Sequence, residues 1–207
     1  MSQGRRRVTA LAGDTFSHSK ATLRSALRRL RASIGAADRR AAARRAATRL
    51  RRWPTFNRAR RIGVYLSVRS ELSTAPLIQA LHRAGCLPWV PVVTARGMQF
   101  APLRPGAQLR KDPLGLPRPV HAQPLRQARA LDLVLLPLVG FDDRGRRLGG
   151  GGGYYDRALA YRHGRRPLLV GYAYAAQETA AVPAEAWDMA LDAVVTEREL
   201  RHFRKVV

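Results

Sequence analysis

Apolar residues recur along the chain with two spacings, one typical of helices and one typical of buried strands. Residues 20–34 repeat apolar positions at helical spacing and predict a helix with its arginines largely outside the core. Residues 39–52, rich in Ala and Arg, predict a second helix that ends before Pro54, and a third begins after Thr74 and ends at Gly85. The apolar stripe of the first helix, which we expect to face the core, is Leu23, Leu27, Leu30 and Ile34.

Short apolar runs between these helices predict the strands of one sheet. Pro88 and Pro91 favour an edge or irregular position for the second of them. Residues 102–124 read as a long ordered loop, residues 178–186 as a short helix with a turn, and residues 191–196 as the strand that closes the sheet. Strands that alternate with helices predict an α/β fold, an open, mostly parallel sheet in a three-layer α/β/α, Rossmann-like arrangement. The predicted strands are residues 62–66, 87–93, 98–101, 131–139, 168–173 and 191–196.

Composition limits the domain organisation and the compartment. The 207 residues are 46% hydrophobic, which predicts a single domain over residues 20–207 after a basic, disordered leader at residues 1–19. No apolar run reaches the roughly 18–20 residues of a membrane span. The one cysteine, Cys86, predicted as a small buried residue, excludes an internal disulfide framework and favours a cytoplasmic location. We expect a monomer.

The charge is strongly basic, with 38 Lys and Arg against 14 Asp and Glu and a formal net charge of +24. This excess favours a polyanionic partner and predicts non-specific binding to nucleic acid. A basic nucleic-acid-binding protein on an α/β scaffold is therefore the alternative functional hypothesis. The arginines are spread over several segments, however, and few aromatic residues lie between them, unlike the stacking platforms that bind single strands.

Five consecutive glycines, residues 149–153, lie between the strand predicted at residues 131–139 and a helix predicted to begin at Tyr154. Glycines at such a junction let the backbone approach a ligand, and free N–H groups at a helix start attract anions. The run lacks the Lys-Ser or Lys-Thr of a P-loop and the spacing of the dinucleotide fingerprint. It indicates a phosphate-binding loop without identifying the nucleotide, and a flexible linker is the alternative.

The remaining polar residues favour phosphoryl transfer over nucleophilic catalysis. No G-x-S-x-G elbow is present, and the five histidines are scattered. Asp156, just after the glycines, is a candidate Mg²⁺ ligand, with Asp188 or Asp192 as the second carboxylate. Asp156 at the start of a helix also has a purely structural interpretation, which is stabilisation of the helix dipole.

Four blocks of the chain resemble the 5-formyltetrahydrofolate cyclo-ligase family, also called methenyltetrahydrofolate synthetases. The Gly/Tyr/Tyr/Asp signature is the most specific block, and the resemblance extends over residues 20–197. Two positions depart from the family pattern: glycines replace the basic residues that some members carry at 150 and 152, and Trp187 replaces the usual His. The bare glycines leave open a third hypothesis, an ATP-binding scaffold without catalysis. The matching blocks are Lys20-x-x-Leu23-Arg24, Tyr65-Leu66-Ser67-x-x-x-Glu71, Gly140-Phe141-Asp142 through Gly153-Tyr154-Tyr155-Asp156, and Gly171-Tyr172-Ala173-Tyr174 with residues 182–192.

The resemblance implies ATP- and Mg²⁺-dependent closure of 5-formyltetrahydrofolate to 5,10-methenyltetrahydrofolate, with release of ADP and phosphate. It implies Arg147 and Tyr154 as catalytic residues and Asp156 and Asp192 as metal ligands. The folate-binding residues that it implies are Leu66, Glu71, Gly150, Gly151, Gly152, Gly153 and Tyr154. The ATP-binding residues that it implies are Lys20, Arg24, Arg147, Leu148, Gly149, Gly150, Gly151, Gly152, Gly153, Tyr154 and Tyr155.

Overall fold

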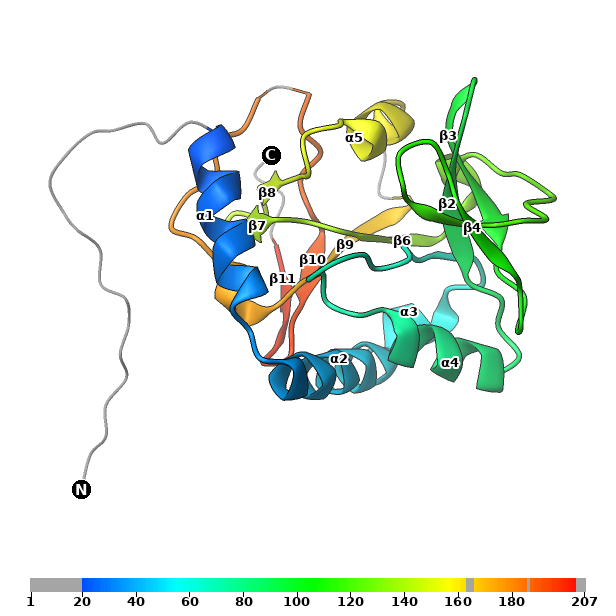
Figure 1. Ribbon diagram of the computed structural model, residues 1–207, viewed down its shortest axis with the longest axis horizontal. Helices are drawn as coiled ribbons and strands as arrows, with labels where there is room; N and C mark the ends of the chain where they lie inside the picture. The colour runs from blue at the N-terminus through cyan, green and yellow to red at the C-terminus, as the bar shows by residue number, and fades with distance from the viewer. Residues whose placement is uncertain (1–19, 163–165, 186, 204–207) are drawn as a thin grey trace, which may run out of the picture.

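The three-layer α/β/α architecture predicted from the sequence is confirmed by the computed structural model, which describes residues 20–162, 166–185 and 187–203 (Figure 1). The leader predicted at residues 1–19 lies outside these described residues. The helices are α1 (Lys20–Ala32), α2 (Ala36–Arg51), α3 (Pro54–Arg58), α4 (Ala75–Arg83) and α5 (Tyr154–Leu159), with 3₁₀ turns η1 (Ala128–Ala130) and η2 (Ala175–Gln177). The strands are β1 (Ile62–Gly63), β2 (Trp89–Thr94), β3 (Gly97–Pro102), β4 (Leu109–Lys111), β5 (Pro117–Pro119), β6 (Leu133–Leu136), β7 (Gly140–Phe141), β8 (Arg147–Leu148), β9 (Leu168–Tyr172), β10 (Ala193–Val195) and β11 (Leu200–His202).

The main sheet has seven strands in the order β11-β10-β9-β6-β1-β2-β3. The inner pairs are parallel, and the two outermost pairs, β10–β11 and β2–β3, are antiparallel. The central strand β6 is buried on both faces, because Leu133 and Leu135 pack into one half of the core and Val134 and Leu136 into the other. A strand buried on both faces explains the continuous apolar run in the sequence.

Helices cover both faces of the sheet (Figure 1). On one face, α2, α3 and α4 contribute apolar side chains such as Leu50, Phe56 and Leu77 to the larger core cluster. On the other face, α5 contributes Leu159 to a second cluster. Helix α1 lies beside the small β7–β8 hairpin, where Leu27 packs with Val139 and Leu148. No helix in the described part of the chain is long and apolar enough to cross a bilayer.

Three local predictions are wrong, two of them because a short strand pairs with its neighbour along the chain. Residues 191–196 do not close the sheet, since β11 pairs outside β10. Residues 102–124 are not simply a loop, because β4 and β5 pair as a separate hairpin. Residues 178–185 contain no helix; the 3₁₀ turn η2 precedes them.

Strand β2 is not an edge strand, although its prolines favour one, and its pairing explains why they are tolerated. Strand β2 lies between β1 and β3, yet its only paired residue on the β1 side is Trp89. From Val90 onward that side has no strand neighbour, so Pro91 removes no ladder hydrogen bond there. Cys86 is another difference: it is exposed on the connection between α4 and β2, not buried as predicted.

The apolar stripe predicted at residues 20–34 is confirmed at Leu23, Leu27 and Ile34, which pack in or against the core. The prediction is wrong for Leu30 and Arg31. Leu27 is buried, but Leu30 is 45% exposed, and Arg31 is only 7% exposed. The helix therefore turns part of its cationic side inward, toward the segments that follow β1 and β6. This orientation is the first structural indication of an anionic ligand on that side.

Candidate functional site

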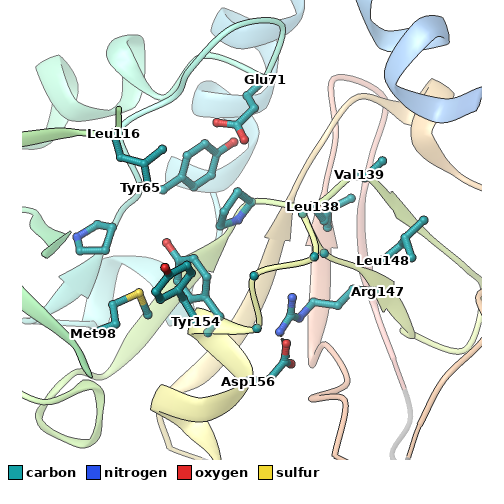
Figure 2. A pocket seen from close by; sticks show the side chains of 18 of the residues that line it. Tyr65, Glu71, Met98, Leu116, Leu138, Val139, Arg147, Leu148, Tyr154 and Asp156 are labelled. Carbon is teal, nitrogen blue, oxygen red and sulfur yellow. Dashed lines mark hydrogen bonds and ion pairs between the residues drawn. The ribbon is translucent and has the colours of Figure 1, made fainter. Parts of the chain in front are cut away.

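A cavity of about 670 Å³ lies beyond the carboxyl ends of the parallel strands β1 and β6, a common location of ligand sites in open α/β sheets. Figure 2 shows Tyr65 and Glu71 on one side of it, the Arg147–Asp156 pair on the other, and Tyr154 between them. Helix α1, the glycine run and the two hairpins β2–β3 and β4–β5 complete the lining. Segments from most of the chain thus meet at one site.

The β7–β8 hairpin positions the glycine loop, which we define as residues 149–153. The carboxylate of buried Asp142 accepts hydrogen bonds from the amides of Arg144 and Arg146 at 3.0 and 2.9 Å and from the amide of Val182 at 3.0 Å. This carboxylate fixes the turn of the hairpin and anchors it to the C-terminal part of the chain. The predicted connection between strand and glycines is therefore an ordered hairpin.

The glycine loop has a conformation that side chains would oppose. Gly151 and Gly153 have φ values of 106° and 62°, in the region that residues with a Cβ rarely adopt. Gly153 immediately precedes α5, so the loop leads directly into the N-terminus of that helix. The linker interpretation is not supported, because every loop residue contributes to the cavity wall.

Three arginines hold the glycine loop by its carbonyl groups. Arg24 donates to the oxygen of Gly149 at 3.0 Å and Arg28 to that of Gly150 at 2.9 Å, both from α1. Arg157 of α5 donates to the oxygen of Gly152 at 2.9 Å. Within the described residues, no amide of residues 150–153 donates a hydrogen bond to the protein. The loop therefore offers N–H donors and nearby guanidinium charge to an anion.

Charged residues cluster at the end of the cavity next to this loop. Nη2 of Arg147 lies 2.5 Å from Oδ1 of Asp156, and the amide of Met189 also donates to that oxygen at 3.2 Å. Lys20 bridges two further acids, with Nζ 2.7 Å from Asp188 and 3.1 Å from Glu185. The segment that carries Asp188 thus packs against Asp156.

The protonation of this cluster favours oxygen ligands for a cation. Burial acts to raise the pKa of Asp188, but hydrogen bonds from Lys20 and the Glu185 amide outweigh it and leave that pKa below its ordinary value. Asp188 is therefore ionised at neutral pH. No group of three or more metal-binding side chains occurs among the described residues. Mg²⁺ commonly uses only one or two carboxylates together with substrate phosphates, and Asp156 with Asp188 fits that donor set.

Asp192, the second metal ligand predicted from the resemblance, does not line the cavity. Its Oδ2 lies 2.5 Å from Nη2 of Arg162 and accepts a hydrogen bond from the amide of Leu169 at 2.8 Å. These contacts attach the start of β10 to β9. We therefore replace Asp192 with Asp188 as the candidate partner of Asp156.

The opposite end of the cavity is more apolar and contains the partly buried carboxylate of Glu71, with Asp112 also in the wall that the β4–β5 hairpin forms. The carboxylate of Glu71 accepts a hydrogen bond from the amide of Val68 at 3.0 Å. Burial raises the pKa of Glu71, although this hydrogen bond and the charges of Arg31 and Arg69 act in the opposite direction. The hydroxyl of buried Tyr65 donates to the carbonyls of Leu72 and Tyr172 at 3.0 and 3.2 Å, which fixes the backbone beside Glu71.

Two tyrosines connect the ends of the cavity. The guanidinium of Arg157 lies 5.1 Å from the centre of the Tyr154 ring, which holds this ring over the glycine loop. Burial strongly raises the pKa of Tyr155, and the charges of Glu71 and Arg147 both affect its phenol. Tyr155 therefore stays protonated at physiological pH and lies within reach of both ends of the cavity.

The structure brings all the predicted site residues except Asp192 to this one cavity. Sequence reasoning missed Arg28, Arg31 and Arg157 as lining residues. Arg28 and Arg31 could have been found, because they continue the helix face of Lys20 and Arg24 at spacings of four and three. No sequence motif marks the walls that the two hairpins form. Met98 and Leu116 line the cavity only because the folded chain brings these hairpins to it.

Comparison with known proteins gives a consistent result over most of the chain. The sequence profile of the 5-formyltetrahydrofolate cyclo-ligase family matches residues 16–197. The 5-formyltetrahydrofolate cyclo-ligase of Escherichia coli K12 is 38% identical over 155 residues, which are 73% of this chain and 85% of that protein. The Haemophilus influenzae protein of the same name is 31% identical over 173 residues, covering 82% of this chain and 92% of its own length.

Solved structures agree with this result. The NMR structure of Aquifex aeolicus 5,10-methenyltetrahydrofolate synthetase superposes with a TM-score of 0.79 at 28% identity, covering 91% of this chain and 94% of that one. A 5,10-methenyltetrahydrofolate synthetase from Mycoplasma pneumoniae superposes with a TM-score of 0.70 at 21% identity, covering 86% and 99%, and supports the fold alone.

Proposed function

This chain belongs to the 5-formyltetrahydrofolate cyclo-ligase family, and on that premise we propose that it uses ATP and Mg²⁺ to close 5-formyltetrahydrofolate to 5,10-methenyltetrahydrofolate, releasing ADP and phosphate. One observation carries the proposal. One cavity of about 670 Å³ has the glycine loop with its N–H donors at one end and a more apolar lining with the partly buried Glu71 at the other. Groups that suit a phosphate and groups that suit an apolar, hydrogen-bonding ligand therefore face the same space.

The reaction needs activation of a poor electrophile. The N5-formyl group is amide-like, so N10 of the same folate attacks its carbon slowly. Transfer of the γ-phosphoryl group to the formyl oxygen makes that oxygen a good leaving group, and N10 then forms the new C–N bond. Phosphate departs with the former formyl oxygen, and N10 loses its proton, which leaves the methenyl bridge between N5 and N10. The protein has to align the two ligands and stabilise the charge that is transferred.

The glycine-loop end suits the triphosphate. The unpaired amides of residues 150–153 would bind phosphate oxygens, and Lys20, Arg24 and Arg147 would supply positive charge. Arg28 and Arg157 add guanidinium groups beside a loop that carries no side chains of its own. Asp156 and Asp188 would hold Mg²⁺, which neutralises phosphate charge when it is bound.

The opposite end suits the folate. The partly buried carboxylate of Glu71 would accept hydrogen bonds from pterin N–H groups, which are stronger when the acceptor is ionised. Leu66 and Met98 give this end of the cavity apolar walls. Tyr154 and residues 150–153 lie where the two ligands would meet, and we assign Arg147 and Tyr154 the catalytic roles of stabilising charge and orienting the formyl group.

The experiment that tests this function follows formation of the methenyl product by its absorbance, with purified protein, ATP, Mg²⁺ and 5-formyltetrahydrofolate. Product is expected only when all three components are present. Asp156→Asn is expected to lower kcat at least about 100-fold, because Mg²⁺ would lose one of its two carboxylate ligands. Asp143→Asn, on the exposed part of the β7–β8 hairpin, is the matched control and should leave kcat unchanged. ATP hydrolysis without folate, or product without ATP, would contradict the proposal.

We further propose that the enzyme works as a cytoplasmic monomer. Light scattering after gel filtration tests the oligomeric state, with the expected mass of 23.0 kDa for the single chain. A mass near twice this value would contradict the monomer.

A further inference from the structure

Trp187 stands apart from the other tryptophans. It is 69% exposed and nevertheless lines the cavity. Trp53 and Trp89 are only partly exposed and each has a partner: the ring centres of Trp53 and His202 are 5.1 Å apart, and the guanidinium of Arg126 lies 5.5 Å from the ring of Trp89. A large apolar ring left exposed at the wall of a cavity indicates contact with a ligand.

The turn that carries Trp187 is held firmly. The amide of Asp188 donates to the carbonyl of Glu185 at 3.0 Å, and the amide of Glu185 donates to the carboxylate of Asp188 at 2.9 Å. Lys20 of α1 forms ion pairs with both acids. The indole is therefore presented by an anchored turn, which reduces the entropy that binding would cost.

The position of this turn indicates which of the two ligands the indole would contact. Trp187 immediately precedes Asp188, and the amide of Met189 donates to Asp156 at 3.2 Å. These contacts place Trp187 at the Arg147–Asp156 end of the cavity, whereas Glu71 lies on the other side (Figure 2). A planar group that contacts Trp187 would therefore lie close to the phosphates at the glycine loop, as the base of a nucleotide does.

We propose that the indole of Trp187 stacks on the adenine base of the nucleotide whose phosphates bind the glycine loop. This assignment rests on the proposed function and adds a residue that contacts the base. An indole face offers stacking surface to any planar heterocycle, and loss of such a contact commonly weakens binding about tenfold or more. The phosphates, in contrast, interact with the loop and the arginines and do not need the indole.

The test compares two ligands that differ in the base. Calorimetry with Mg²⁺ measures binding of ATP and of inorganic tripolyphosphate to the wild-type protein, Trp187→Ala and Trp187→Phe. We expect Trp187→Ala to weaken ATP binding about tenfold and to leave tripolyphosphate binding unchanged. Trp187→Phe should retain most of the ATP affinity, because a smaller stacking surface remains. Wild-type tryptophan fluorescence should respond to ATP and not to tripolyphosphate.

Each other result overturns the assignment. An equal loss for both ligands would show that Trp187 only supports the turn, and no loss would show that the base lies elsewhere. Weaker binding of 5-formyltetrahydrofolate with unchanged ATP affinity would place the indole on the pterin. If the wild-type protein binds neither ATP nor tripolyphosphate, the proposed function itself fails, an outcome distinct from failure of the Trp187 assignment alone.

Discussion

Helices α1 and α2 have similar basic compositions, but their cations occupy different surroundings. In α1, Lys20, Arg24, Arg28 and Arg31 lie along one side of the helix, and all four line the cavity. In α2, a face of alanines with Leu50 packs against the sheet, while arginines such as Arg44 and Arg45 are exposed. The difference comes from what each helix covers, because α2 lies on apolar strands and α1 lies over a site with free polar groups.

The two helices show that the total charge of the protein differs from the charge available to a ligand at the cavity. A net charge of +24 does not identify which arginines contact a ligand. Small alanine side chains form the face of α2 that packs against the sheet, and most of its arginines lie on the opposite, exposed side. In α1, by contrast, Arg24 and Arg28 donate hydrogen bonds to carbonyl groups of the glycine loop.

The largest effect is expected from removing two cations of α1. Arg24→Ala with Arg28→Ala should lower kcat/KM for ATP at least about 100-fold, since each charge-assisted contact is worth roughly 1.5–3 kcal/mol. Arg44→Ala with Arg45→Ala removes the same charge from α2 and serves as the control, with kcat/KM expected to stay unchanged. Steady-state kinetics at saturating folate measures both. Equal losses in the two variants would show that charge acts over the whole surface and not at this cavity.

A smaller effect on stability is expected from the buried cation of α1. Arg31 donates to Ser70 at 3.1 Å and to the carbonyl of Leu138 at 3.3 Å. Arg31→Ala leaves both acceptors without this partner, so urea denaturation should show a loss of about 2 kcal/mol in unfolding free energy. Arg40→Ala, at an exposed position of α2, should change it by less than about 0.5 kcal/mol. A stability of Arg31→Ala equal to wild type would mean that the inward orientation of α1 does not depend on this residue.

A still smaller effect concerns the acid that Arg31 faces. Burial raises the folded-state pKa of Glu71 above its unfolded value, so its ionisation destabilises the fold as pH rises through the folded pKa. Glu71→Gln should therefore show a slightly higher Tm than wild type at neutral pH, and the two curves should converge below the ordinary glutamate pKa. Folate binding should be lost in the same variant. A lower Tm at pH 7 would indicate that Arg31 and Arg69 outweigh the cost of burial.

The smallest difference is expected in binding to nucleic acid. If the association is non-specific, the α1 and α2 double variants should weaken it equally and reduce the salt slope to a similar extent, about 0.9 per lost phosphate contact. Salt titrations with a double-stranded DNA fragment measure this slope. A specific effect of the α2 variant alone would favour the nucleic-acid hypothesis.

The sequence predicts the parts of this molecule that have local causes. Apolar runs predict the parallel strands, and the glycine run before Tyr154 predicts an anion loop at a helix start. Strand β11 and the β4–β5 hairpin are not predicted, because strands of three residues are too short to show an alternating apolar pattern. Apolar spacing correctly predicts that Leu23 and Leu27 of α1 pack inward, but it does not predict the burial of Arg31.

The same distinction holds for the site. Family motifs correctly predict three charged residues of the cavity, Lys20, Glu71 and Asp156. Asp192 also belongs to a motif, but its carboxylate connects β10 to β9 instead. Spacing along the chain does not show whether an acid faces a cavity or a backbone amide. In the sequence, Trp187 differs from the usual His of the family pattern, which assigns it no role. Its exposure beside the cavity gives it a testable role.

The central claim is that the formyl oxygen becomes a phosphate oxygen in this cavity. The direct measurement uses 5-formyltetrahydrofolate labelled with ¹⁸O in the formyl group and follows the label by mass spectrometry after one turnover with ATP. The account predicts that the label appears in inorganic phosphate in a one-to-one ratio with the methenyl product. Label found in water, with unlabelled phosphate, would contradict it.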